Sequence, residues 1–88
     1  MKFAIGQVVI TRGVNAEISK SIEFSKFILE SIARFRNRDW EDVPEEDKRM
    51  NDAAVKNGDD RIVARYNDIY IITEWDRSVT TILFTNEY

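Results

Sequence analysis

The chain ends in two runs of β-branched and aromatic residues that are separated by one short polar break. The first run covers residues 69–73, and the second covers residues 79–84. Residues of these kinds favour β-strands, while the Asp76 and Ser78 side chains in the break favour a turn. The pattern predicts a β-hairpin at the centre of a small sheet, so the fold must be one that is built around a sheet.

Two more strands are predicted upstream of this hairpin. Residues 3–10 carry apolar side chains at both sets of alternating positions and end at a turn around Gly13, which predicts a strand buried on both sides. Residues 61–66 predict another strand, which a turn at residues 67–68 joins to the hairpin. The last three strands would therefore form an antiparallel meander.

Helical periodicity marks residues 23–37. Apolar residues recur there at intervals of three and four, and the resulting stripe is predicted to enter the core through Phe24, Phe27, Ile28, Ile32 and Phe35. A short helical turn over residues 16–20 is expected to precede this helix, with Asn15 as its cap.

A further helix is predicted to begin at Pro44, which suits the first helical position because it lacks an amide hydrogen. Acidic residues follow it directly, where the helix dipole favours negative charge. The pattern continues to Val55, and Asn57-Gly58 predicts a left-handed cap that ends the helix. Much of the negative charge in this region therefore has a structural explanation.

These elements predict an α+β fold with a four-stranded, mainly antiparallel sheet and helices packed on one face. The order along the chain is one strand, the helices, and then the three-strand meander. We expect residues 1–88 to form a single domain, because two separate cores could not each bury enough apolar surface to offset the conformational entropy of the chain.

The composition argues against most enzyme classes. The chain contains neither cysteine nor histidine. It therefore has no thiolate nucleophile, no cysteine zinc site and no histidine to act as a general base. We therefore predict no catalytic residue, no cofactor and no metal site. The sequence also lacks an apolar run near eighteen residues and a signal-peptide pattern at its start, which predicts a cytoplasmic protein without membrane contact.

Several sequence strings occur here together, and their combination resembles a known family. They are Gly6-Gln7-Val8-Val9, Thr11-Arg12-Gly13, Asp39-Trp40-x-Asp42, Glu46-Asp47-Lys48-x-x-Asn51-Asp52-x-Ala54-x-x-Asn57-Gly58-Asp59, Ile71-Ile72-Thr73-Glu74-x-Asp76-Arg77-Ser78-Val79-Thr80-Thr81-x-Leu83-Phe84 and Glu87-Tyr88. The chain resembles, over nearly its whole length, short proteins carried on plasmids, phages and integrated elements of Gram-positive gut bacteria, which are usually labelled plasmid-related or hypothetical. The resemblance implies an association with mobile elements and implies no reaction.

The chain departs from this family at three positions. Glu41 stands where the family has glycine, Trp75 where it has alanine, and Thr85 where it has proline. These differences make the loop after the long helix more acidic and the hairpin tip more aromatic. A contact surface is therefore expected to differ from that of the relatives.

Charge is distributed unevenly along the chain. Residues 1–38 hold seven Lys or Arg against three Glu, whereas residues 39–60 hold nine Asp or Glu against three Lys or Arg. The acidic segment is either a solvated face or a binding surface for a host or element-encoded protein with a basic surface. In the second interpretation the chain inhibits a host defence nuclease by imitating nucleic-acid phosphates, with Asp39, Trp40, Glu41, Asp42, Glu45 and Glu46 as partner-binding residues. Trp40 would either cap the core or serve as an exposed interface anchor.

The hairpin turn offers an alternative function in another class, a small-ligand or nucleotide-binding module. An arginine guanidinium binds phosphate or carboxylate through two parallel hydrogen bonds, and threonine hydroxyls could complete such a site. The candidate ligand-binding residues are Glu74, Asp76, Arg77, Thr80 and Thr81. The structural interpretation is that the same residues only form a turn, with Glu74 and Arg77 paired at the surface.

Two further functions lack a matching motif or charge pattern. A metal-dependent nuclease would use Asp39, Asp42, Glu74 and Asp76, but no recognised ligand motif accompanies them. Direct DNA binding would use Lys20, Lys26, Arg34, Arg36 and Arg38, but glutamates on the same helix and the acidic net charge oppose it. We expect no direct nucleic-acid binding, and the sequence leaves the oligomeric state open.

Overall fold

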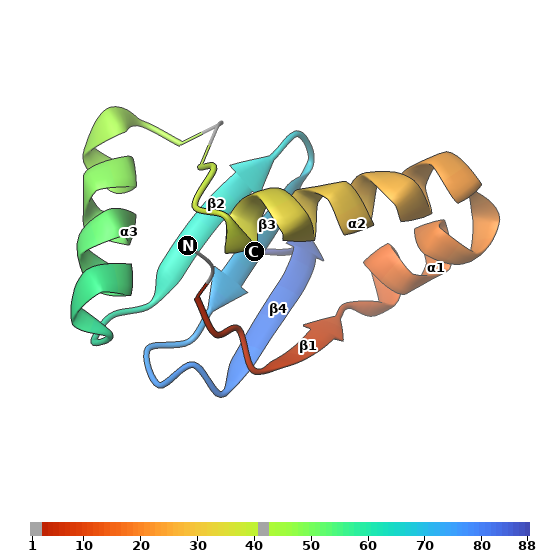
Figure 1. Ribbon diagram of the computed structural model, residues 1–88. Coiled ribbons are helices and arrows are strands. Elements are labelled where there is room, and N and C mark those ends of the chain that lie inside the picture. Colours follow the sequence, from red (N-terminus) through yellow and green to blue (C-terminus); the bar gives the residue numbers. More distant parts are fainter. Residues whose placement is uncertain (1–2, 41–42) are drawn as a thin grey trace.

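The meander forms most of a four-stranded sheet in the computed structural model, which describes residues 3–40 and 43–88 (Figure 1). The strands are β1 (Gln7–Ile10), β2 (Ile62–Tyr66), β3 (Ile69–Thr73) and β4 (Val79–Phe84). Their order across the sheet is β1-β4-β3-β2, with β1 parallel to β4 and the other pairs antiparallel. The predicted α+β class is confirmed, and the hairpin of β3 and β4 lies at the centre of the sheet.

The expectation that the first strand is buried on both sides is wrong. β1 lies at an edge of the sheet, and all four of its residues are exposed. The chain enters a helix directly after β1 and reaches the sheet again only at β2, so β1 pairs with β4 alone. Because β1 has a neighbouring strand on one side only, its side chains have fewer neighbours than those of the inner strands.

Two consecutive helices follow β1. α1 (Arg12–Lys20) begins four residues earlier than expected, because Thr11 rather than Asn15 is its cap and accepts a backbone hydrogen bond at 3.2 Å. α2 (Ile22–Arg36) begins directly after Ser21, whose hydroxyl caps it in the same way at 3.1 Å. The chain therefore turns sharply at Ser21.

The apolar stripe of α2 enters the core as predicted. Ile28 and Phe35 are buried, and Phe24, Phe27 and Ile32 are partly buried against them. The strands contribute the alternate side chains on the helix-facing side of the sheet, namely Ile62, Ala64, Tyr66, Ile69, Ile71 and Ile82.

α3 (Glu45–Asn57) lies beside β2 (Figure 1). Pro44 precedes its first residue, so the proline is one position earlier than expected. The predicted left-handed cap is confirmed, because Gly58 has a φ of 67° and donates its amide hydrogen to the Ala54 carbonyl at 2.8 Å.

Asn51 of α3 closes the outer edge of β2. Its Nδ2 donates to the Val63 carbonyl at 2.8 Å, and its Oδ1 accepts from the Val63 amide at 3.3 Å. The Asn51 side chain thus replaces a neighbouring strand for one residue, and it is itself buried. Strand edges that lack such partners tend to pair with other chains.

We expect the change Asn51→Ala to lower the free energy of unfolding by about 1–3 kcal/mol, because it leaves both polar groups of Val63 without their partner in a partly buried place. Urea denaturation followed by circular dichroism measures this. Lys56→Ala, an exposed site on the same helix, serves as the control and should change stability by less than about 0.5 kcal/mol. Equal losses at the two positions would contradict the edge-closing role.

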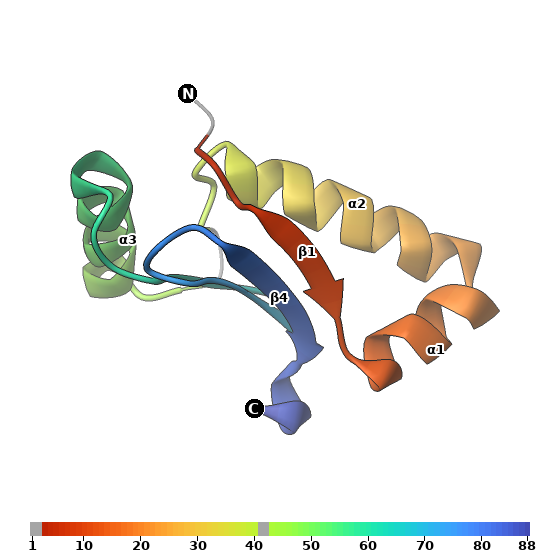
Figure 2. The same cartoon turned by 90° about the horizontal axis from the view of Figure 1, so that it is seen from below.

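The face of the sheet opposite the helices is open. In Figure 2 α2 lies above β1 and β4, α1 lies beside the end of β1, and the short 3-10 helix η1 (Thr85–Glu87) lies below the end of β4. Alternation along the strands puts these side chains on the open face: Val9, Val63, Arg65, Tyr70, Ile72, Val79, Thr81 and Leu83. Within residues 3–40 and 43–88, no helix combines the length and the apolar character needed to cross a bilayer.

Candidate functional site

The start of α3 presents three carboxylates to solvent. Glu45, Glu46 and Asp47 occupy the first turn of the helix, and all three are exposed. No side chain caps this helix start, so the negative charges are favoured there by the dipole of the helix. Of the three, Glu45 has a weak ion pair with Lys48 at 3.4 Å. Among the described residues of the predicted acidic surface, this turn gathers three exposed carboxylates next to one another.

Other carboxylates of the acidic segment are engaged within the protein. Asp39 accepts from the Arg34 guanidinium at 2.8 Å. Asp52 accepts from the indole Nε1 of Trp40 at 2.9 Å and lies 3.4 Å from the Arg38 guanidinium. These contacts reduce the charge that Asp39 and Asp52 offer to a partner, so the acidic surface is narrower than the sequence suggests.

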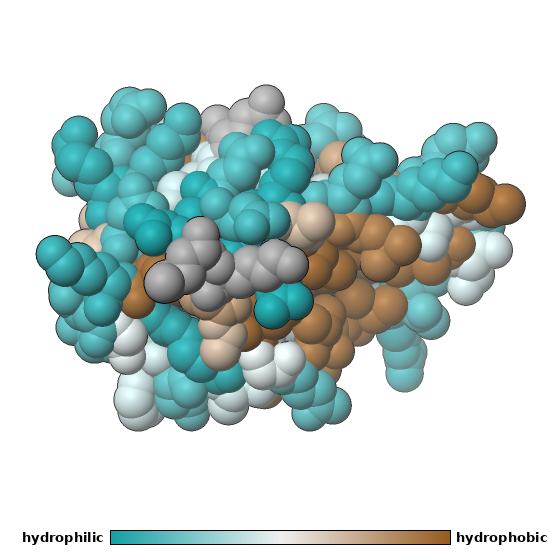
Figure 3. All heavy atoms as spheres, in the orientation of Figure 1, coloured by the Kyte–Doolittle hydropathy of each residue, from teal (hydrophilic) through white to brown (hydrophobic). Residues whose placement is uncertain are grey.

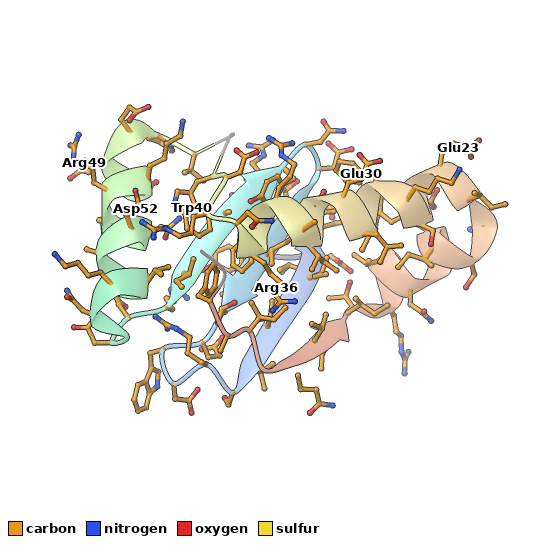
Figure 4. The ribbon with its side chains drawn as sticks, viewed as in Figure 1. Glu23, Glu30, Arg36, Trp40, Arg49 and Asp52 are labelled. Atoms are coloured by element: carbon orange, nitrogen blue, oxygen red, sulfur yellow. The ribbon has the colours of Figure 1, made fainter. Side chains whose placement is uncertain are left out.

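Trp40 is part of the core and not an exposed anchor. Only 3% of it is accessible, and its ring packs against Phe3 and Phe35 with centroids 5.8 and 5.4 Å away. Figure 4 shows Trp40 and Asp52 pointing toward one another from the loop and from α3. Trp40 therefore supports the loop from beneath, as one of the two sequence interpretations predicts. Glu41 and Asp42, the other predicted partner-binding residues, lie outside the described residues.

A hollow of about 430 Å³ lies on the open face of the sheet beside the acidic turn. Its floor is formed by Val63 and Tyr70, and one wall is formed by Asp47 and Met50 of α3. Tyr88 closes the other side, where its ring lies 5.4 Å from that of Tyr70. The hollow therefore combines an apolar and aromatic floor with a charged rim.

Two arginines also border the hollow. Arg61 donates to the Tyr88 hydroxyl at 3.1 Å, and Arg65 donates to the Asn67 carbonyl at 2.9 Å. Sequence reasoning missed this site. The sequence feature that could have revealed it is the alternation in β3. Tyr70 stands between Ile69 and Ile71, so its side chain must face away from the core.

The hairpin turn is built differently from the predicted ligand site. The Nη1 atom of Arg77 donates to the carbonyls of Asp60 at 2.6 Å, Trp75 at 3.0 Å and Glu74 at 3.3 Å. Its Nη2 atom donates to the Ala54 carbonyl at 2.8 Å. Arg77 thus ties the turn to the end of α3. The structural interpretation paired its guanidinium with the Glu74 carboxylate, but these contacts are all with backbone carbonyls.

The other hairpin candidates are divided between core and surface. Thr80 is buried, shares a 2.6 Å hydrogen bond with Thr73 and donates to the Ile5 carbonyl at 2.6 Å. Thr81 lies on the opposite, open face. Asp76 is exposed and accepts from the Ser78 amide and hydroxyl at 3.1 and 2.6 Å. The structure therefore does not gather these residues around one cavity.

The two hydrogen bonds from Ser78 stabilise the charged form of Asp76. They hold the pKa of this carboxyl below its ordinary value. Since the pKa is lower in the folded protein, the stabilisation is present above the ordinary pKa of an aspartate and is lost as the pH falls through the folded value. This effect belongs to the turn and gives no sign of a ligand.

Comparisons with known proteins bring no relative. No family model, no curated protein and no solved structure matches this chain. Among the side chains that the structure describes, no group of three or more acidic residues is arranged to hold a metal ion. Function must therefore be inferred from the geometry of the open-face hollow and the acidic turn.

Proposed function

We propose that this chain is a non-enzymatic, cytoplasmic binding protein of a mobile genetic element, and that it acts by occupying a basic surface on a host or element-encoded protein. One observation carries the proposal: the exposed carboxylates at the start of α3 adjoin the hollow on the open face of the sheet. Protein interfaces commonly combine a desolvated apolar or aromatic centre with a charged rim.

The charge at the start of α3 favours a basic partner. Glu45 and Glu46 are exposed, and Asp47, the next residue of the turn, lines the hollow. Carboxylates spaced along one helical turn attract lysine and arginine side chains and speed their approach at low salt. In its most specific form, the proposal is that the acidic turn takes the place of nucleic-acid phosphates in the basic groove of a host defence nuclease and thereby inhibits it.

The hollow supplies the apolar half of the contact. Tyr70, Tyr88 and Met50 offer aromatic and thioether surface, and Met50 and Tyr88 are 57% and 69% exposed. An aliphatic or aromatic side chain of the partner would fill the hollow and displace water from it. Such an anchor would give the contact a specificity that charge alone does not supply.

We expect the double change Glu45→Lys and Glu46→Lys to weaken partner binding by about tenfold or more, because it juxtaposes like charges across the contact. The partner is first captured from a lysate of a Gram-positive gut bacterium and identified by mass spectrometry, and its affinity is then measured with purified proteins at several salt concentrations. Binding by the unchanged protein should decline as salt rises.

The matched control is Asp68→Lys with Glu74→Lys, which makes the same change in net charge at two exposed positions away from the α3 start. Each variant should remain folded, with a loss of less than about 1 kcal/mol per changed residue. If the two double variants bind the partner equally well, the acidic turn of α3 is not the contact surface.

The small-ligand alternative has a separate readout. It predicts that nucleotides raise the melting temperature while added salt leaves partner binding unchanged. The geometry opposes a ligand site at the hairpin turn, because the Arg77 guanidinium donates to four backbone carbonyls and Thr80 is buried. A thermal shift with nucleotides would favour ligand binding over the protein-binding proposal.

A further inference from the structure

The outer edge of β1 has hydrogen-bonding groups that face away from the sheet. Gln7 donates its amide hydrogen to the Ser78 carbonyl at 3.0 Å, and Thr11 donates to the Ile82 carbonyl at 3.2 Å. Since backbone groups alternate along a strand, the amides of residues 7, 9 and 11 face β4, and those of Val8 and Ile10 face outward. No described segment lies along that outer side (Figure 2).

The two edges of the sheet are treated differently. At β2 the Asn51 side chain occupies the outward groups of Val63. β1 has the sequence Gln-Val-Val-Ile, with neither a charged residue nor a proline. Charged residues and proline are the usual features that keep an edge strand from pairing with another chain, and β1 lacks both.

The side chains beside this edge are apolar. Val8 and Ile10 lie on the helix-facing side of the sheet, because their neighbours on β4 are Thr80 and Ile82, and they are 40% and 38% exposed. Figure 3 shows apolar residues gathered on this face between α2 and β1. An open edge and an uncovered apolar strip therefore coincide.

We infer that β1 pairs with β1 of a second copy of this chain, antiparallel and about a two-fold axis at Val9, to form a continuous eight-stranded sheet. In that register Val8 of one copy faces Ile10 of the other, and these are the residues whose backbone groups face outward. The pairing satisfies the amide and carbonyl groups of both residues in each copy. It also brings the two apolar strips together on the same side of the sheet.

Charge at the two ends of β1 favours a second copy over an unrelated strand. Arg12 follows the strand and is exposed, and the turn that carries the exposed Asp76 packs against Gly6 at its other end. An antiparallel copy brings Arg12 to the Gly6 end of its neighbour, where the turn that carries Asp76 offers a charge of opposite sign. A two-fold axis makes this contact twice, as a self-complementary interface requires.

This inference is independent of the proposed function. β1 and β2 are the opposite edges of the sheet, and the acidic turn and its hollow lie beside β2. Pairing through β1 would therefore leave the binding surface free in both copies.

Sedimentation equilibrium over a range of concentrations tests the inference. The unchanged protein should have twice the 10.3 kDa mass of one chain, and Val8→Lys should raise the dimer dissociation constant about tenfold or more. Ala53→Lys, at an exposed position of α3 that does not line the hollow, is the matched control and should leave the mass unchanged.

Amide hydrogen exchange of the unchanged protein supplies a second readout that needs no variant. The Val8 and Ile10 amides should become protected as the concentration rises, whereas the Val9 amide, which faces β4, should be protected throughout. A mass of one chain at every concentration, assembly beyond two copies, or a dimer whose Val8 and Ile10 amides exchange freely would each overturn the inference.

Discussion

Phe35→Ala should lower the free energy of unfolding by about 3–5 kcal/mol, the range for removing a fully buried phenylalanine ring. Phe35 has no accessible surface, and its ring lies edge-on to Phe3 at 5.3 Å and to Trp40 at 5.4 Å. The alanine would leave a cavity between α2 and the loop that Trp40 supports. Urea denaturation measures the loss, and the fluorescence of Trp40 should shift to the red as its environment becomes wetter.

Glu30→Ala is the control on the same helix. Glu30 is exposed and points away from the sheet in Figure 4, so its loss should cost well under about 1 kcal/mol. Small and similar losses at Phe35 and Glu30 would mean that α2 is rotated relative to the arrangement described above. A large loss at Phe35 alone supports the arrangement in which the face of α2 that carries Phe35 is buried.

The second large effect is expected at Arg77. Arg77→Ala removes four hydrogen bonds from a guanidinium to backbone carbonyls and should cost about 2–3 kcal/mol, because hydrogen bonds to a charged group contribute more than neutral ones. Arg77→Lys keeps the positive charge but loses the planar fork, so we expect an intermediate loss of about 1–2 kcal/mol. The measurement is again the free energy of unfolding in urea.

The backbone of Arg77 provides an internal control. Its φ is 62°, a left-handed conformation that costs a residue with a side chain about 1–2 kcal/mol and costs glycine little. Arg77→Gly should therefore be less destabilising than Arg77→Ala by roughly 0.5–1 kcal/mol, although both lack the guanidinium. A loss below about 0.5 kcal/mol in all three variants would show that the guanidinium contacts do not hold the turn to α3.

Local patterns in the sequence predicted the elements whose cause is local. The apolar stripe that includes Ile28 and Phe35 identified the core face of α2, and Asn57-Gly58 identified the end of α3. The alternating runs after residue 60 identified the three-strand meander. In each case the periodicity or the cap lies within one turn or one strand, so its physical reason can be found within a few neighbouring residues.

The candidate site was predicted only in part. The exposed carboxylates at the start of α3 follow from the sequence, whereas the hollow beside them depends on Tyr70 and Tyr88, which come together from β3 and the end of the chain. The buried indole of Trp40 likewise finds its hydrogen-bond acceptor in Asp52, twelve residues away. Side chains that meet across such distances leave no regular spacing in the sequence.

By itself, the sequence determined the α+β class, the central hairpin and the core face of the long helix, because hydrophobic periodicity fixes which side of each element is buried. Tertiary structure alone decided that β1 is an exposed edge, that Asn51 closes the opposite edge, and that Arg77 binds carbonyls 17 and 23 residues away. The physical reason is that exposure and hydrogen-bond partners depend on which neighbour packs alongside. An apolar strand has the same sequence pattern whether a second strand covers its outer edge or none does.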